Sequence, residues 1–169
     1  MYGTLISTQT LASTTLGVTF SSIPATYTDL VLVCSLREAG AVVQAGAGVN
    51  SINGDAGANY IHRTLYGTGS AAASNTQTTT NVAFYSVPGA SATANTFSNI
   101  IITFPNYTSS TAKTFSIDAV MENNAATSFQ EIVAATWTGT AAINSFKIDY
   151  SYSGFVAGST LSLYGLTHF

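Results

Sequence analysis

Short stretches with the two-residue period of β-strands, separated by turn-forming residues, constrain the fold of this chain more than any other sequence feature. Residues 4–10 alternate in this way. Residues 29–36 form an almost continuous apolar run, which is typical of a strand buried on both faces. Further candidates, rich in Val, Ile, Thr, Phe and Tyr, are residues 81–87, 97–104, 114–121, 131–137, 143–152 and 160–167. No window has the apolar spacing of a helix, so the pattern predicts an all-β chain.

Turn-forming residues separate these strands. Ile23-Pro24 ends a second strand, because proline cannot donate to a sheet ladder and restricts the residue before it. Asn53-Gly54 favours a tight turn with positive φ. Pro88-Gly89 and Pro105-Asn106 mark two further turns. Residues 67–80 are polar and low in complexity, and we expect them to form an exposed loop or arm.

The length of 169 residues, without a fixed repeat or a linker, predicts one domain covering residues 1–169. Many short strands with Gly and Pro turns favour a single antiparallel β-sandwich of jelly-roll-like form. Residues 39–49, rich in Ala, Gly and Val, fit this pattern least well. One helical turn is the most that residues 39–47 allow, and their glycines weaken even that.

Charged residues make up 7% of the chain against 46% hydrophobic residues, whereas an ordinary soluble domain is about 25% charged. The exterior must therefore be formed largely by hydroxyl and amide groups, which suits a protein covered by neighbours in an assembly. The net charge is −3, and the four basic residues are scattered along the sequence. Nucleic-acid binding is therefore not expected, since it needs clustered Lys and Arg.

The sequence also indicates where the protein is used. No stretch reaches the roughly 18 apolar residues that a membrane span needs, so no membrane partner is expected. The first residues lack the basic start and long apolar run of a secretory signal. We therefore expect a product that is made and used without export.

Nucleophiles and general bases are scarce. Cys34 is the single cysteine and lies inside an apolar run, which predicts a buried thiol that packs as a small apolar side chain. His62 is expected to be a strand residue with a satisfied ring nitrogen, and His168 lies next to the C-terminus. Neither histidine stands in a triad pattern.

The acidic residues give no catalytic or metal site either. Asp118 and Glu122 would lie about 13 Å apart on one face of a strand, too far for a glycosidase pair. Asn53-Gly54-Asp55 lacks the alternating ligands of a calcium loop, and no paired His or Cys suggests zinc. The sequence therefore predicts no catalytic residue, no cofactor and no metal, and a chain that is not an enzyme.

Aromatic residues are the remaining candidates for binding. Tyrosines could offer flat faces to sugars or to another protein, and Tyr is a common anchor of interfaces. The alternative is that most of these rings fill the core. The rings considered are Tyr60, Tyr66, Tyr107, Tyr150, Tyr152 and Tyr164. Tyr60, Tyr66, Tyr107 and Arg63 are the predicted interface residues.

Several motifs, taken in order, resemble a family of structural proteins from tailed bacteriophages, especially phages of cyanobacteria. They are FSSIP (20–24), YTDL (27–30), NGD (53–55), NY (59–60), LYG (65–67), PNY (105–107), Trp137, AI (142–143), FVAGS (155–159) and LSLYGL (161–166). The resemblance spans residues 5–166 and implies a β-sandwich with a structural role and no catalytic motif.

Two functions follow as expectations from the resemblance and the composition. The first is a capsid decoration (cement) protein, a homotrimer that binds the major capsid protein on the virion surface after synthesis in the host cytoplasm. Such a protein would oppose shell expansion by clamping several subunits at once. The second is a tail or fibre adhesion module that binds host-surface glycan through exposed Tyr and Asn.

Overall fold

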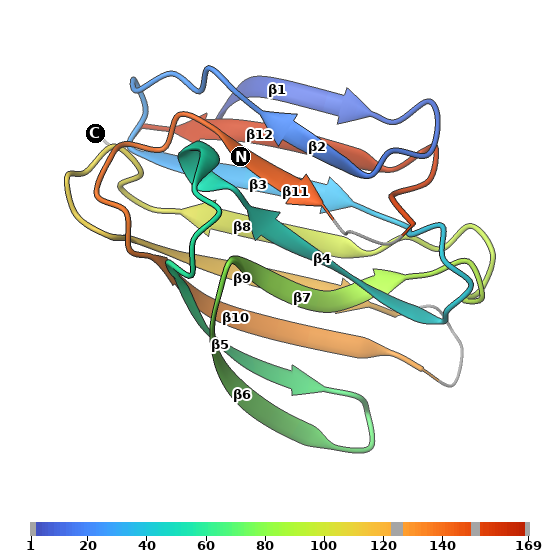
Figure 1. Cartoon of the computed structure of the whole chain (residues 1–169). Helices are drawn as coiled ribbons and strands as arrows, with labels where there is room; N and C mark the ends of the chain where they lie inside the picture. The colour runs from blue at the N-terminus through green and yellow to red at the C-terminus, as the bar shows by residue number, and fades with distance from the viewer. Residues whose placement is uncertain (1–2, 123–126, 150–152, 168–169) are drawn as a thin grey trace.

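The computed structural model describes residues 3–122, 127–149 and 153–167, which form two antiparallel sheets packed face to face (Figure 1). The larger sheet contains, in spatial order, β1 (Thr4–Thr10), β12 (Thr160–Leu166), β3 (Asp29–Ser35), β8 (Asn99–Phe104), β9 (Lys113–Met121), β10 (Phe129–Trp137), β5 (Tyr60–Gly67) and β6 (Ala72–Thr79). The smaller sheet contains β2 (Gly17–Phe20), β11 (Phe146–Asp149), β4 (Gln44–Asn50) and β7 (Asn81–Pro88). The predicted all-β antiparallel sandwich is confirmed.

The core lies between the two sheets and follows the two-residue period of the strands. In β9, Phe115, Ile117 and Ala119 are buried while the residues between them are exposed. The ring of Phe104 in β8 lies 4.8 Å from Phe115 and 5.2 Å from Phe146 of the smaller sheet, measured between centroids. Such tilted aromatic pairs add about 0.5–1.5 kcal/mol each beyond their buried area, so these contacts help to join the sheets.

The prediction of a loop over residues 67–80 is wrong. Residues 72–79 form β6, an edge strand whose eight residues pair in unbroken register with β5, and the connecting turn is confined to residues 68–71. Most of β6 is exposed on both faces, with only Gln77 and Thr79 partly buried. Its sequence therefore shows no apolar alternation. Hydrogen bonds to β5, rather than burial of apolar side chains, hold this strand in place.

The helical turn considered for residues 39–47 is also wrong. Residues 44–50 form β4, which lies between β11 and β7 in the smaller sheet. Its register shifts between Ala45 and Ala47, as at a β-bulge. Small residues suit this position, because a Cβ added to Gly48 would lie 3.2 Å from the Val82 carbonyl oxygen. Close packing of neighbouring strands outweighed the weak strand propensity of Ala and Gly.

The predicted turn at Asn53-Gly54 is confirmed. It forms a short 3-10 helix, Ile52–Gly54, in which Asn53 and Gly54 have φ values of 53° and 79°. Asn106 follows Pro105 with a φ of 47°, which Asn tolerates better than most residues.

The sheets differ in width, and this difference shapes the surface. β7 is the edge of the smaller sheet, and β5 and β6 extend beyond it (Figure 1). The inward side of the β5–β6 hairpin is therefore not covered by a second sheet, but only flanked by the edge of β7. This overhang positions the groove described next.

Candidate functional site

A groove of about 300 Å³ lies between the β7 edge and the inward side of the β5–β6 hairpin. Its floor is formed by His62, Thr64 and Tyr66 of β5 and by Asn75 and Gln77 of β6. These residues alternate along each strand, so they share the face that points towards the smaller sheet. Glu131 and Phe129 of β10 lie on the same sheet as the floor. The opposite side is formed by Gln44 of β4 and by Ala83 and Tyr85 of β7.

Glu131 is 2% exposed and is held by the edge of β7. One of its carboxylate oxygens, Oε2, accepts hydrogen bonds from the Tyr85 backbone N–H at 2.5 Å and from Ser86 Oγ at 2.8 Å. Burial raises the pKa of Glu131, and these hydrogen bonds oppose the rise. The carboxylate therefore satisfies an edge strand that would otherwise offer an unpaired N–H to the groove.

His62 is also 2% exposed, and its Nδ1 atom has no hydrogen-bond partner among the described residues. Burial lowers the pKa of its imidazole, which keeps the ring neutral near pH 7. The expected strand position is confirmed, but the expectation of a satisfied ring nitrogen is wrong for Nδ1. Glu131 pairs with Tyr66, four residues along β5 from His62, so about 13 Å of strand separates the two groups. They do not form a catalytic dyad.

Aromatic rings line both sides of the groove. Tyr66 stacks on Phe129 with centroids 5.1 Å apart and an interplanar angle of 16°. Across the groove, the side chain of Tyr85 is 44% exposed. Tyr66 is thus the predicted interface tyrosine that the structure places at this site.

Two other predicted interface residues lie in the core. Tyr60 and Tyr107 are fully buried, so the prediction that they form an interface is wrong. The Tyr60 hydroxyl accepts a hydrogen bond from Ile52 N and donates one to Asp55 O, each at 2.9 Å. The Tyr107 hydroxyl donates to the Pro24 carbonyl. Both hydroxyls anchor loops, as the alternative of core rings implies. Tyr164 is partly buried, and Tyr150 and Tyr152 lie outside the described residues.

The second candidate surface is the outward side of the larger sheet, which we call the open face: Arg63 and Leu65 of β5, Ile132 of β10, Asp118 of β9 and Ile101 of β8. Leu65 and Ile132 are direct cross-strand neighbours, and their side chains are 56% and 52% exposed. Ile132 also neighbours Asp118, which in turn neighbours Ile101. Arg63 is also exposed on this face, and its role at an interface stays a prediction.

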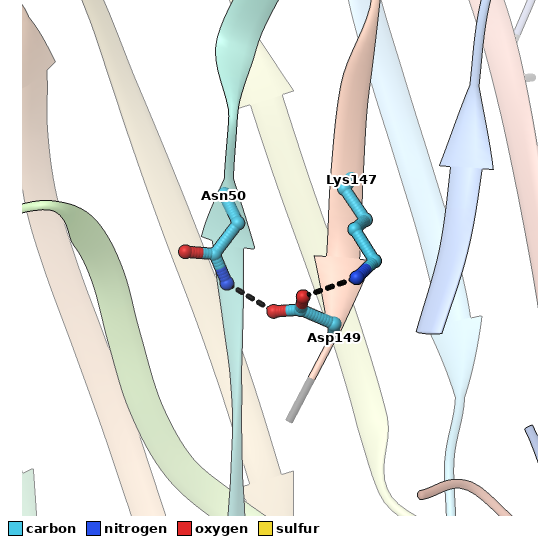
Figure 2. Close-up of polar contacts among 3 residues, drawn as sticks. All are labelled: Asn50, Lys147 and Asp149. Carbon is cyan, nitrogen blue, oxygen red and sulfur yellow. Dashed lines mark hydrogen bonds and ion pairs between the residues drawn. The ribbon is translucent and has the colours of Figure 1, made fainter. Parts of the chain in front are cut away.

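Most of the sparse charge is not available to partners. Arg37, Glu38, Lys113 and Glu131 are buried, and their charges cancel in number. On the smaller sheet, Asp149 lies between Lys147 and Asn50 (Figure 2). Lys147 Nζ lies 2.7 Å from Asp149 Oδ2, and the Asn50 side-chain amide donates to the other carboxylate oxygen. The exterior is therefore still poorer in free charge than the composition indicates.

Cys34, Asp118 and Glu122, which were considered for chemistry in the sequence, differ in their exposure. Cys34 is buried, and burial raises the pKa of its thiol. Asp118 is exposed on β9, and Glu122 follows that strand on the surface. Within the described ranges, no three His, Cys, Asp or Glu side chains are grouped so that they could hold a metal ion. His168 lies outside the described residues.

The sequence did not reveal several residues of these surfaces. Asn75 and Gln77 fell in the stretch assigned to a loop, and Leu65 and Ile132 were not among the predicted interface residues. One signal in the sequence could have revealed the exposed Ile132. Ile132 and Val133 are consecutive, so one of the two must lie on the outward face of β10.

In the described part of the chain, no helix has the length and apolar character that crossing a membrane requires. Comparison with known proteins found no matching family model, no matching curated protein and no matching solved structure.

Proposed function

We propose that this chain is a non-enzymatic structural protein of a phage virion, a decoration protein that binds the outer surface of the capsid and bridges major capsid protein subunits. The observation that carries this proposal is the open face. Two large apolar side chains, Leu65 and Ile132, lie next to each other and half exposed, on a face that also carries Arg63 and Asp118. Contiguous exposed apolar side chains rimmed by polar residues are characteristic of protein contacts.

The energetics favour a multivalent contact. Burying the exposed halves of Leu65 and Ile132 contributes about 1.5–3 kcal/mol per subunit, since full burial of such a side chain contributes about 1.5–3 kcal/mol. A contact free energy of this size is too small to hold a single subunit firmly. In a homotrimer, three such contacts act together, and linked contacts raise the overall affinity well above that of one. Arg63 and Asp118 are the charged side chains of the open face, and a docked partner must pair them or leave them in water.

The test uses particles stripped of this protein and then incubated with purified protein. We expect stripped particles to rupture at lower temperature and added wild-type protein to restore their stability. Ile132→Asp places a carboxylate in the contact and should weaken rebinding by at least about tenfold, or 1.4 kcal/mol. Leu16→Asp is the matched control, because Leu16 is 62% exposed but lies beside β2 of the smaller sheet.

Two outcomes oppose the proposal. One is that particles with and without the protein rupture at the same temperature. The other is that Ile132→Asp rebinds as well as Leu16→Asp. The mass of the purified protein in solution tests the trimer separately, and the copy number per virion tests the location.

A tail or fibre adhesion module that binds host glycan is the second candidate, and the groove is the observation that favours it. Its amide, hydroxyl and aromatic groups suit a sugar better than a protein surface. A handful of copies per virion, rather than hundreds, would favour this candidate over the capsid.

A further inference from the structure

The groove has a polar floor at a place where the sandwich interior would be apolar. Tyr60, at the start of the inward row of β5, is buried in the core, but the next two residues of that row are His62 and Thr64. They are 2% and 5% exposed. Burying polar groups costs free energy unless they are hydrogen-bonded, so a polar floor at this depth needs polar partners.

One partner is missing among the described residues: nothing there bonds to His62 Nδ1. A buried unsatisfied group costs about 1–3 kcal/mol. A neutral imidazole nitrogen is a donor in one tautomer and an acceptor in the other. A hydroxyl group satisfies either, since it both donates and accepts. Because Nδ1 is buried, a ligand hydroxyl can satisfy it only when the imidazole turns towards the groove.

The charges around the groove restrict the ligand further. No Lys or Arg lines it, and its one carboxylate, Glu131, already accepts two hydrogen bonds. An anionic ligand would meet that carboxylate with no compensating cation. An apolar ligand would leave His62, Asn75 and Gln77 without partners. A neutral ligand with several hydroxyl groups meets neither difficulty.

Shape and aromatic lining fit the same class. About 300 Å³ is the lower end of the usual range for ligand pockets, which suits one or two sugar rings. The stacked Tyr66–Phe129 pair and the exposed Tyr85 ring offer apolar faces to the C–H groups of a sugar. The side-chain amides of Asn75 and Gln77 offer both donors and acceptors to its hydroxyls.

We propose that this groove binds a neutral saccharide unit, with amide contacts from Asn75 and Gln77 and aromatic contacts from Tyr66 and Tyr85. A sugar hydroxyl would reach the buried His62 Nδ1 on rotation of the imidazole towards the groove. This inference gives the adhesion candidate its ligand class. It does not rest on capsid docking, because the groove and the open face lie on opposite sides of the larger sheet.

The test is an NMR titration of the purified protein that follows the imidazole signals of His62 and the ring signals of Tyr66 and Tyr85. The probes are glucose, galactose, mannose, N-acetylglucosamine and short oligomers of each, with glucuronic acid and inorganic phosphate as anionic probes. We expect saturable shifts of all three residues with at least one neutral saccharide, and none with the anionic probes.

Two variants on one strand provide matched controls. Gln77→Ala should weaken saccharide binding about three- to tenfold, the effect of one hydrogen bond. Thr76→Ala, which changes the opposite side of β6, should stay within about twofold of wild type. His62→Phe should abolish binding, but it changes a buried residue. Gln77 is only partly buried, so Gln77→Ala tests the site without changing the core.

The proposal is overturned if no neutral saccharide gives saturable shifts, if the anionic probes bind as well, or if Thr76→Ala weakens binding as much as Gln77→Ala. None of these outcomes bears on the open face, whose test is rebinding of Ile132→Asp to capsids. The two proposals therefore fail separately.

Discussion

At the scale of single residues, the buried charges are held by backbone groups. Arg37 donates to the carbonyls of residues 90, 92, 93 and 96 at 2.8–3.3 Å. Lys113 Nζ donates to the carbonyls of Thr111 and Thr140, and Glu38 accepts from Gly40 N at 2.6 Å. Each buried charge thus fixes a loop or an edge. The buried charges therefore stabilise the protein's own loops and strand edges.

The pH dependence of stability tests this use for Glu131. Its pKa is raised above the ordinary value of 4.5, so the native state binds its proton more tightly than the unfolded chain does. The stability from this difference is present at acid pH and is lost as pH rises from about 4.5 through the raised native pKa. Glu131→Gln cannot titrate, yet its amide oxygen still accepts from Tyr85 N and Ser86 Oγ.

Urea unfolding of wild type and Glu131→Gln at several pH values between about 4 and 7 measures the effect. We expect wild-type stability to fall relative to the variant as pH rises. The difference in unfolding free energy between wild type and variant removes the contributions of the other titrating groups, including His62 and Asp55. A difference that is constant, or that grows in favour of wild type with pH, contradicts the assignment.

At the scale of elements, loops depend on single side chains that reach across from neighbouring strands. The segment between β7 and β8 is held by Arg37, which follows β3, while Ser98 at its end exchanges hydrogen bonds with Leu36. Likewise, the turn after β4 is held by Tyr60 of β5 and by Asp55, which accepts from Trp137 Nε1 at 2.7 Å. Hydrogen bonds to Trp137, Gly57 and Asn59 lower the pKa of Asp55.

Arg37→Met should destabilise the protein by about 2–4 kcal/mol, because several carbonyls lose a charged donor and some stay buried without a partner. Arg63→Met is the matched control, since Arg63 is exposed on the open face, and should change stability by less than about 0.5 kcal/mol. Urea unfolding gives both values, and amide hydrogen exchange of residues 92 and 96 reports the loop directly. Equal effects of the two variants would contradict the role of Arg37 in holding the segment between β7 and β8.

The sequence predicted most of the elements whose side chains alternate or run apolar, although for β5 it indicated only that His62 is a strand residue. β1, β3, β9 and β12 match their predicted ranges to within a residue at each end. β4 was missed because most of the residues that it buries are small, among them Ala45 and Ala47. β6 was missed because its hydroxyl and amide side chains are mostly exposed, and pairing with β5 holds it. The groove could not be predicted, because it depends on sheet width: only the strand order reveals that the β5–β6 hairpin extends beyond β7.

At the scale of the whole molecule, the sandwich separates its two candidate surfaces. The open face lies outside the larger sheet, and the groove lies inside it, beyond the edge of the smaller sheet. The core lies between the two sheets, beside the groove. It includes Cys34 of β3, a strand that is flanked on both sides by β12 and β8. Opening that region requires breaking the centre of the larger sheet.

Cys34 therefore provides a probe of global unfolding. It is the single cysteine of the chain, is 2% exposed, and has a thiol whose pKa is raised by burial. We expect a thiol reagent to label it only through global opening, so that the free energy from labelling equals that from urea unfolding. Arg37→Met should speed labelling in proportion to its loss of stability. Rapid labelling under native conditions would contradict this view of the core.

The position of β6 has a consequence for how this protein can diversify. None of its side chains belongs to the hydrophobic core, yet Asn75 and Gln77 belong to the floor of the groove. Substitutions there change what the groove accepts without opening a cavity or straining the core. Substitutions at Asn75 and Gln77 would therefore change the ligand preference proposed for the groove, while the core residues that preserve the fold stay unchanged.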